Sequence, residues 1–300
     1  SKVRTDDLAS HVIQSLIKRH DFDPSSIDDV IIGCANQAGE DNRNIARMAL
    51  LLAGLPITVP GETINRLCSS GMSAIIHAHR AIQAGDGDIF LSGGVENMTR
   101  GPWVISKSSK PFGRDSEMYD SSFGWRFINP KLDEIYGTES MGKTAENLAE
   151  KYQISRIQQD EFAYESHQRA QKAIENGHFD DQILPLETKT KGGTISFGRD
   201  EHVRSDIKLE DMTGLRPAFK KDGSVTAGNA SGINDAAAAV VLMSEDKAQN
   251  HNAKPFARII GYGHAGVEPS EMGIGPVPAV KNMLDRMGMR IEEFDIVESN

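Results

Sequence analysis

The sequence has no long hydrophobic run and few cysteines. Its longest apolar stretch, MALLLAGLP at 48–56, falls well short of the roughly 20 residues that a membrane-spanning helix requires. Residues 1–10 contain no hydrophobic core of the kind found in signal peptides. Two cysteines, Cys34 and Cys68, cannot build a disulfide framework. We therefore expect a protein of the cytoplasm with no membrane partner.

Positive charge is also scarce. The chain carries 33 Lys and Arg against 43 Asp and Glu, a net charge of −10, which argues against a nucleic-acid partner because phosphate binding needs a basic surface. The spacing of His and Cys offers no metal-ligand set. The glycine pair in LSGGVENM is too little for a dinucleotide fingerprint. We expect no metal and no permanently bound cofactor.

Regular periodicity is present in the first third of the chain. The N-terminal apolar residues recur at helical spacing, with Thr5 or Asp6 as the expected N-cap. Strand and helix patterns then alternate, which is typical of a layered α/β domain. The expected strands are 30–33, 62–67 and 88–94, and the expected helices are 41–54 and 69–85.

The middle of the chain is less regular. Residues 100–136 are aromatic and punctuated by Gly and Pro, and two polar amphipathic helices are expected over 144–152 and 155–176. Regularity returns at AAAAVVLMS (236–244), which predicts a fully buried strand. An irregular insertion between two regular regions is typical of a binding segment.

The order helix, turn, paired acids and buried strand occurs twice. It is found at 7–36 and again at 277–300, which predicts a strand at DIVES (295–299) and an internal duplication. The first copy continues into further strands, whereas nothing follows the second. We expect the sequence to be incomplete at both ends.

Cys68 is the candidate nucleophile. It lies in NRLCSSGMSAI (65–75), where a predicted strand leads into a predicted helix, the kind of elbow that projects a nucleophile. A helix N-terminus favours the reactive thiolate, and the N–H of Cys68 could stabilise an oxyanion. A lone cysteine is otherwise a buried and inert residue, and we assign that role to Cys34.

The stretch INRLCSSGMSAI (64–75) resembles the acyl-enzyme signature of the thiolases. Two further stretches, GCANQAGEDNRN (33–44) and FGWRFINP (123–130), look like the thiolases that cleave 3-oxoadipyl-CoA. Other segments are similar to thiolase segments and occur in thiolase order. They are 33–56, 91–103, 141–147, 215–219, 225–244, 272–279 and 297–300.

The resemblance implies a fold. Thiolases stack two similar βαβαβαββ halves in a five-layer αβαβα arrangement with an inserted α+β loop domain. We expect residues 1–97 with 234–252 to form the N-terminal half, 98–233 the CoA-binding loop domain, and 253–300 the start of an incomplete C-terminal half. The family also implies a homodimer or homotetramer.

The resemblance also implies an activity. In the family, the cysteine at Cys68 takes an acyl group from a 3-oxoacyl-CoA and passes it to coenzyme A, which is a substrate. For 3-oxoadipyl-CoA the products are succinyl-CoA and acetyl-CoA. The alternatives are an acetoacetyl-CoA thiolase, a fatty-acid 3-ketoacyl-CoA thiolase, a condensing ketoacyl synthase, or a catalytically incomplete CoA-binding fragment.

Several residues match family positions. Asn300 matches the asparagine that holds an oxyanion-hole water, and Arg204 a position near the nucleotide. The family's GHP histidine and CxGGG second cysteine do not occur in these 300 residues, and we nominate no catalytic histidine. The pantetheine contacts implied by the resemblance are Ser231, Ala227, Met141, Phe219 and Met272. Without the resemblance, the two methionines and Phe219 would be expected to fill a core.

Two positions bear on the acyl chain. Ser140 stands where acetoacetyl-CoA thiolases usually have His, which leaves room for a longer or polar acyl group. A dicarboxylic acyl tail requires a cation, and charge complementarity suggests Arg126 and Arg66.

Overall fold

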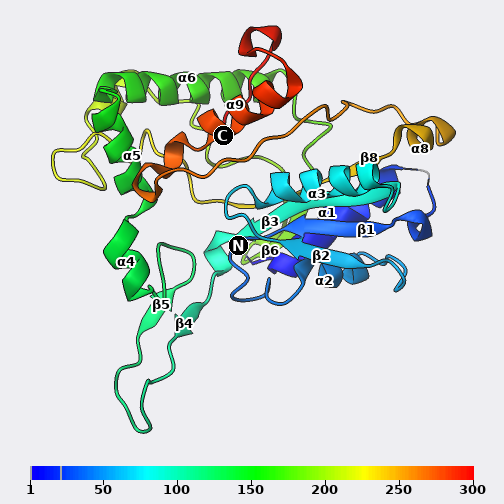
Figure 1. Ribbon diagram of the computed structural model, residues 1–300, viewed down its shortest axis with the longest axis horizontal. Coiled ribbons are helices and arrows are strands. Elements are labelled where there is room, and N and C mark those ends of the chain that lie inside the picture. Colours follow the sequence, from blue (N-terminus) through cyan, green and yellow to red (C-terminus); the bar gives the residue numbers. More distant parts are fainter. Residues whose placement is uncertain (1, 21) are drawn as a thin grey trace. The chain divides into compact units, whose positions relative to one another are not determined.

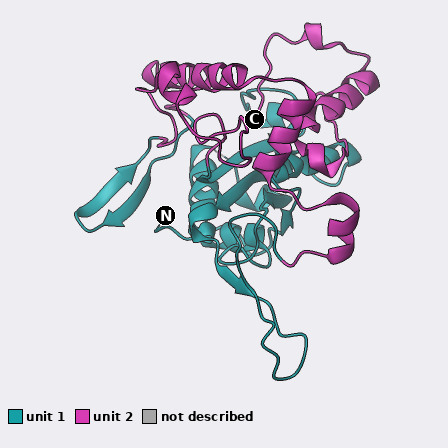
Figure 2. Ribbon diagram, turned by 90° about the vertical axis from the view of Figure 1, so that its left-hand side faces the viewer, with its two compact units in different colours: residues 1–126, 182–199, 233–258 teal, residues 127–181, 200–232, 259–300 magenta. Residues whose placement is uncertain are grey.

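The computed structural model describes residues 2–20 and 22–300, which form two compact units (Figure 2). Unit 1 comprises residues 1–126, 182–199 and 233–258, and unit 2 comprises residues 127–181, 200–232 and 259–300. Residues within each unit contact one another more than they contact residues of the other unit. The domain boundaries inferred from the resemblance stay a prediction.

Unit 1 is built on a four-stranded sheet in the order β2-β1-β3-β8 (Figure 1). Strands β1 (Asp29–Gly33), β2 (Gly61–Ile64) and β3 (Ile89–Asn97) are parallel. Strand β8 (Asp235–Met243) runs antiparallel to β3. The alternation expected from the sequence is confirmed.

Helices cover both faces of this sheet. Helices α1 (Thr5–Arg19) and α2 (Ile45–Leu52) lie on one face and α3 (Ser70–Ala84) on the other (Figure 1). The main core is between the first two helices and the sheet, because apolar side chains there exclude water from both surfaces. Its fully buried members include Ile13, Ile45, Leu50, Val30, Ile32 and Leu91.

Short elements complete unit 1. Two antiparallel pairs, β4 with β5 and β6 with β7, and three short helices lie outside the main sheet. Their bounds are β4 Trp103–Ile105, β5 Met118–Asp120, β6 Leu186–Thr190, β7 Gly193–Phe197, η1 Pro24–Ser26, η2 Met98–Arg100 and α8 Glu245–Asn250.

Unit 2 is helical, with no strand among its described residues. The two predicted amphipathic helices are confirmed. The longer one, α6, begins with a capping box between Ser155 and Gln158 and is followed by Gly177 at φ +70°. The helices are α4 Pro130–Tyr136, α5 Met141–Lys151, α6 Arg156–Glu175, α7 Leu209–Thr213, η3 Pro269–Ile274, α9 Pro276–Met287 and η4 Ile291–Glu293.

None of the helices in the described part of the chain combines the length and hydropathy needed to span a membrane.

Strand β8 is not fully buried, so that prediction is wrong. Its residues alternate, with Ala237 and Val241 packed against the core and Val240 43% exposed. β8 is the edge strand of the sheet, with α1 packed on one face and α3 covering only part of the other, near the buried Leu242. A run of apolar letters does not reveal whether one face or both will be covered.

The strand predicted at 295–299 is also wrong. These residues are irregular, and Ile296 and Val297 are 86% and 68% exposed. A strand is stable only when its backbone pairs with another strand, and none lies beside this segment among the described residues.

Two element ends differ from expectation. Helix α1 has Arg4 at the N-cap rather than Thr5 or Asp6. Asp6 is engaged by Arg4, and the N–H of Thr5 donates to Glu40, so a carboxylate 35 residues away replaces the local cap. Strand β2 ends at Ile64, three residues earlier than predicted.

Candidate functional site

Cys68 lies in a turn, residues 65–69, that connects β2 to α3. Its side chain is exposed, as a nucleophile requires. The helix begins at Ser70 with Ser69 as N-cap, so the strand does not lead directly into the helix, as the sequence suggested, but through this turn. Leu67 has φ +49°, a left-handed conformation that costs roughly 1–2 kcal/mol for a residue with a Cβ.

Two side chains hold this turn. The Asn65 Oδ1 accepts the N–H of Leu67 at 2.9 Å. The buried Ser70 Oγ accepts the N–H of Arg66 at 2.8 Å and donates to the carbonyl of Leu67 at 2.5 Å. Sequence reasoning missed Asn65 and Ser70, although Asn and Ser are the residues that commonly bond to nearby backbone in turns.

Glycines bring the start of α3 against the sheet. A Cβ on Gly33, at the end of β1, would lie 2.2 Å from the carbonyl carbon of Ser70. A Cβ on Gly94 of β3 would lie 3.2 Å from the Cα of Gly71. The backbone of α3 therefore rests on the backbone of two strands, which fixes the first turn of the helix beside Cys68.

Cys34 has the opposite environment. It lies directly after β1 and is only 1% exposed, so the predicted burial is confirmed. Its Sγ is 3.6 Å from Oδ2 of Asp41. Burial, together with the negative charges of Glu96 and Asp41, raises the pKa of Cys34 to about 12.

Cys34, Asp41 and Glu96 have ligand atoms within 4.8 Å of one another, a spacing that would suit a metal ion. The two carboxylates, however, already accept backbone N–H groups, so the cluster stabilises loop 34–41. The donors are Ala35 and Asn36 to Glu96, and Gln37 and Gly39 to Asp41. Burial raises the pKa of Glu96, and the two N–H donors counter that effect.

The two arginines suggested for the acyl tail are held differently. The exposed Arg66 donates its Nε–H to Ser73 Oγ at 3.0 Å. Arg126 donates to the carbonyl of Ser121 at 3.1 Å and to Asn36 Oδ1 at 3.1 Å. Within the described residues neither forms an ion pair, so neutral partners orient both guanidinium groups.

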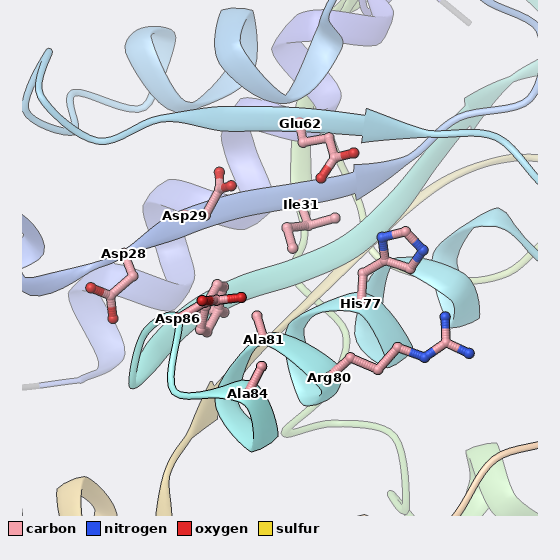
Figure 3. A pocket seen from close by; sticks show the side chains of 10 residues that line it. Asp28, Asp29, Ile31, Glu62, His77, Arg80, Ala81, Ala84 and Asp86 are labelled. Atoms are coloured by element: carbon pink, nitrogen blue, oxygen red, sulfur yellow. The ribbon is translucent and has the colours of Figure 1, made fainter.

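A pocket of about 410 Å³ lies between α3 and the sheet of unit 1 (Figure 3). Its lining includes Asp28, Asp29, Glu62 and Asp86, with His77 and Arg80 from α3. Four carboxylates make it unfavourable for an anionic CoA ester. None of the residues predicted for the site lines it.

In unit 2 the loop 225–232 carries two predicted pantetheine contacts. Ala227 and Ser231 are both exposed. Glu146 of α5, itself 4% exposed, accepts the N–H groups of Ser224 and Val225 at 2.8–2.9 Å. Burial alone would raise the pKa of Glu146, but these donors and the Ser224 hydroxyl hold the pKa below its ordinary value.

A second carboxylate fixes the same loop. Asp160 of α6 is fully buried, accepts from Asn229 Nδ2 at 2.9 Å and pairs with Arg156 at 2.7 Å. Asn229 Oδ1 in turn accepts the N–H of Thr226. Sequence reasoning missed Glu146, Asp160 and Asn229. The contacts of Glu146 and Asp160 with this loop are to residues more than 60 positions further along the chain, so no local pattern marked them.

The three apolar residues predicted as tunnel walls are exposed. Met141, Phe219 and Met272 are 60%, 45% and 41% exposed, so they do not fill a core in unit 2. A Cβ on Gly142 would overlap the Phe219 ring, which places that ring against the start of α5. Phe219 also lines a hollow of about 470 Å³ together with Arg216, Lys220 and Lys221.

Arg204 and Asn300 are also exposed and lie in unit 2. The backbone N–H of Arg204 donates to Nδ1 of His167 at 3.3 Å. Burial lowers the pKa of His167, and the charges of His202 and Arg204 add to this effect. The predicted CoA contacts thus share unit 2, while Cys68, Arg66 and Arg126 share unit 1.

Two domains of one known family match the sequence of this chain. The thiolase N-terminal domain matches residues 1–246, and the thiolase C-terminal domain matches residues 253–300. The chain belongs to the thiolase family.

Curated thiolases are similar over the whole chain. The 3-oxoadipyl-CoA/3-oxo-5,6-dehydrosuberyl-CoA thiolase of Escherichia coli is 51% identical over 302 residues, covering 100% of this chain and 75% of that protein. The beta-ketoadipyl-CoA thiolase of Pseudomonas aeruginosa is 50% identical with the same coverage. A probable acetyl-CoA acyltransferase of Staphylococcus aureus is 46% identical, covering 98% of this chain and 74% of that protein.

Solved thiolase structures confirm the fold. The acetyl-CoA acetyltransferase of Bacillus anthracis superposes with a TM-score of 0.89 at 45% identity, covering 98% of this chain and 73% of that chain. Human mitochondrial 3-ketoacyl-CoA thiolase superposes with a TM-score of 0.90 at 37% identity, covering 100% and 75%. The described residues form a four-stranded sheet in unit 1, and none of the described residues after Met243 is in a strand.

Proposed function

We propose that this thiolase cleaves 3-oxoadipyl-CoA with coenzyme A, giving succinyl-CoA and acetyl-CoA. One observation supports this most directly: of the two cysteines in the described residues, Cys68 is the exposed one, and it stands on a constrained turn within the stretch that resembles the thiolase acyl-enzyme signature. Substrate choice is drawn from the curated relatives at 47–51% identity that are named for this acyl group.

The reaction has two acyl transfers. The Cys68 thiolate attacks the 3-oxo carbonyl, and the bond between C2 and C3 breaks. Its electron pair leaves on C2 as the enolate of acetyl-CoA, which takes up a proton. The thiolate of a second CoA then attacks the carbonyl carbon of the succinyl thioester and expels the Cys68 thiolate. The product of this step is succinyl-CoA. Two modest barriers replace one high barrier for carbon–carbon cleavage.

Unit 2 supplies the proposed CoA contacts. Ser231 and Ala227 sit on a loop clamped by Glu146 and Asp160, which favours precise placement of backbone and hydroxyl groups against the pantetheine amides. The exposed Met141, Phe219 and Met272 offer apolar surface, and Arg204 offers positive charge for phosphate. We propose an oxyanion-hole water at Asn300, and no resident cofactor.

The substrate tail is the specific part of the proposal. Arg126 carries no ion pair among the described residues and is oriented by Asn36 and Ser121, so its charge remains available to a carboxylate. Arg66 is the second candidate. The family supports a homodimer or homotetramer, and we propose a cytoplasmic location.

Acyl trapping tests the chemistry. The protein carrying this sequence is incubated with succinyl-CoA, and the peptide containing Cys68 is examined by mass spectrometry. We expect a succinyl adduct on Cys68 and its loss in Cys68→Ser, with thiolysis reduced by roughly 10³-fold or more. Cys34→Ala is the matched control and should keep the adduct. An adduct that persists in Cys68→Ser would sink the proposal.

Comparison of two substrates tests the specificity. We expect a higher kcat/KM for 3-oxoadipyl-CoA than for acetoacetyl-CoA. Arg126→Ala should raise KM for 3-oxoadipyl-CoA alone, by roughly tenfold, because only that substrate carries a free carboxylate at the end of its acyl chain. Preference for acetoacetyl-CoA would instead support an acetyltransferase like the Bacillus anthracis relative.

A further inference from the structure

The two-residue segment Ala35–Asn36 links the two groups of unit 1 that the proposed reaction uses. The carbonyl of Ala35 accepts from Asn65 Nδ2 at 2.9 Å, and Asn65 Oδ1 holds the N–H of Leu67, the residue before Cys68. On the other side, Asn36 accepts the Arg126 guanidinium through its carbonyl at 3.3 Å and through Oδ1 at 3.1 Å.

One carboxylate fixes this segment. Glu96 Oε2 accepts the N–H of Ala35 at 2.9 Å, and Oε1 accepts the N–H of Asn36 at 3.1 Å. Glu96 lies near the end of β3, where it is held in the ladder opposite Ala236 of β8. A carboxylate that accepts two successive N–H groups forms charge-assisted bonds of defined direction.

We propose that Glu96 is a positioning residue for thiolysis, which sets the Cys68 turn through Ala35 and Asn65, and the tail-binding Arg126 through Asn36. This inference rests on the proposed function. It assigns to one half-buried carboxylate a joint role in nucleophile placement and acyl-chain selection.

The rest of loop 34–41 is anchored independently. Asp41 accepts the N–H groups of Gln37 and Gly39 at 3.0 and 2.8 Å. Loss of the Glu96 bonds therefore releases Ala35 and Asn36 locally while the remainder of the loop keeps its anchor. The Asn65 amide then loses the acceptor that orients it, and Leu67 keeps only its bond to Ser70. With one of its two supports weakened, the left-handed backbone at Leu67 relaxes and the sulfur beside it moves.

The test replaces Glu96 by Gln, which keeps the shape but sets an NH₂ group against one N–H donor. We expect kcat for 3-oxoadipyl-CoA to fall by roughly 10- to 100-fold, since small misplacements of reacting groups have effects of that size. The preference for 3-oxoadipyl-CoA over acetoacetyl-CoA should fall with it. Hydrogen exchange in a peptide spanning 65–69 should accelerate by roughly tenfold.

Two further variants distinguish the route from Glu96 through Asn65 to Cys68 from the route through Asn36 to Arg126. Asn65→Ala should lower kcat and accelerate exchange at 65–69 while leaving the substrate preference unchanged. Asn36→Ala should reduce the substrate preference and leave that exchange unchanged. Glu187→Gln, the same substitution at an exposed position on β6, is the matched control and should change none of the three readouts.

A merely structural role predicts a lower melting temperature for Glu96→Gln with kcat, substrate preference and exchange at 65–69 unchanged, and that result overturns the inference. If Glu96→Gln does not fold, the Asn65 and Asn36 variants test the inference instead. Identical effects of the two variants would exclude separate routes from Glu96 to Cys68 and to Arg126, and would overturn the inference. The exchange measurement needs no turnover. A protein that cleaves no 3-oxoacyl-CoA overturns the proposed function, whereas unchanged exchange in Glu96→Gln overturns this inference.

Discussion

The two cysteines follow the ends of neighbouring parallel strands, yet their environments are opposite. Gly33 of β1 pairs with Ile64 of β2, and Cys34 comes directly after the first strand, while Cys68 comes four residues after the second. Cys34 enters a pocket of core residues and carboxylates, whereas Cys68 is carried outward by a turn with a left-handed residue. The difference shows that the path of the backbone after the strand, rather than the residue type, decides which thiol can react.

The rates at which the two thiols are alkylated measure the difference between Cys34 and Cys68 most directly, and we expect the largest effect here. At pH 8, iodoacetamide should modify Cys68 at least roughly 10³ times faster than Cys34, because a thiol of pKa about 12 is almost never a thiolate at that pH and Cys34 is also shielded. Peptide mass spectrometry gives both rates. Comparable rates would mean that the environments are not opposite.

The substitution Gly33→Ala should disrupt the elbow. Its methyl group would lie 2.2 Å from the carbonyl carbon of Ser70, so α3 must shift, and we expect a loss of about 3 kcal/mol in the free energy of unfolding. Denaturant titration measures it. Gly192→Ala, where the nearest atom is 3.8 Å away, is the control and should change stability by less than about 0.5 kcal/mol.

One carboxylate in each unit, Glu146 in unit 2 and Glu96 in unit 1, should make the stability of the protein depend on pH in opposite ways. Glu146→Gln should lower the free energy of unfolding by about 2 kcal/mol at pH 7, because backbone donors lose a partner. The pKa of Glu146 is held below its ordinary value. Its contribution is therefore present above the unfolded pKa and is lost as pH falls through the folded pKa.

Stability curves from pH 7 down to pH 3 check this sign. The difference in free energy of unfolding between wild type and Glu146→Gln should become smaller as the pH falls. The corresponding difference for Glu96→Gln should not become smaller. Burial raises the pKa of Glu96, so its effect on stability changes with pH in the opposite direction. A gap for Glu146→Gln that is constant over this range would contradict the assignment.

The smallest effect is expected at Ser92. Its hydroxyl lies on β3 opposite Ile31, is fully buried and has no hydrogen-bond partner among the residues that the structure describes. Ser92→Ala should therefore be neutral or raise the free energy of unfolding by up to about 1 kcal/mol. Thermal unfolding checks it, and a loss of more than about 1 kcal/mol would indicate a bond not seen here.

Much of the fold could be predicted because its signals are local. The periodicity of α1, α3 and α6 and the position of Gly177 follow from neighbouring residues alone. The failures are non-local. The apolar letters of β8 and of 295–299 indicate strands, but coverage of a face and the presence of a partner strand depend on distant residues.

The candidate site divides in the same way. Cys68 is conspicuous in the sequence because small and polar residues surround it in a recognisable order. Glu96 is 28 residues away and belongs to another strand, so nothing in its neighbourhood connects it with Cys68. Asp160 and Glu146 were missed for the same reason, since each acts on a loop at least 60 residues further along.

The sequence by itself determined the alternation of helices and strands and the membership in an acyl-transfer family. These properties depend on spacing along the chain, which the order of residues states directly. Only the tertiary structure decided how far the two faces of β8 are covered and which carboxylate holds Ala35 and Asn36, the segment that contacts both Asn65 and Arg126. Those outcomes depend on what lies across the sheet, where burial and hydrogen bonding are shared by residues far apart in the chain.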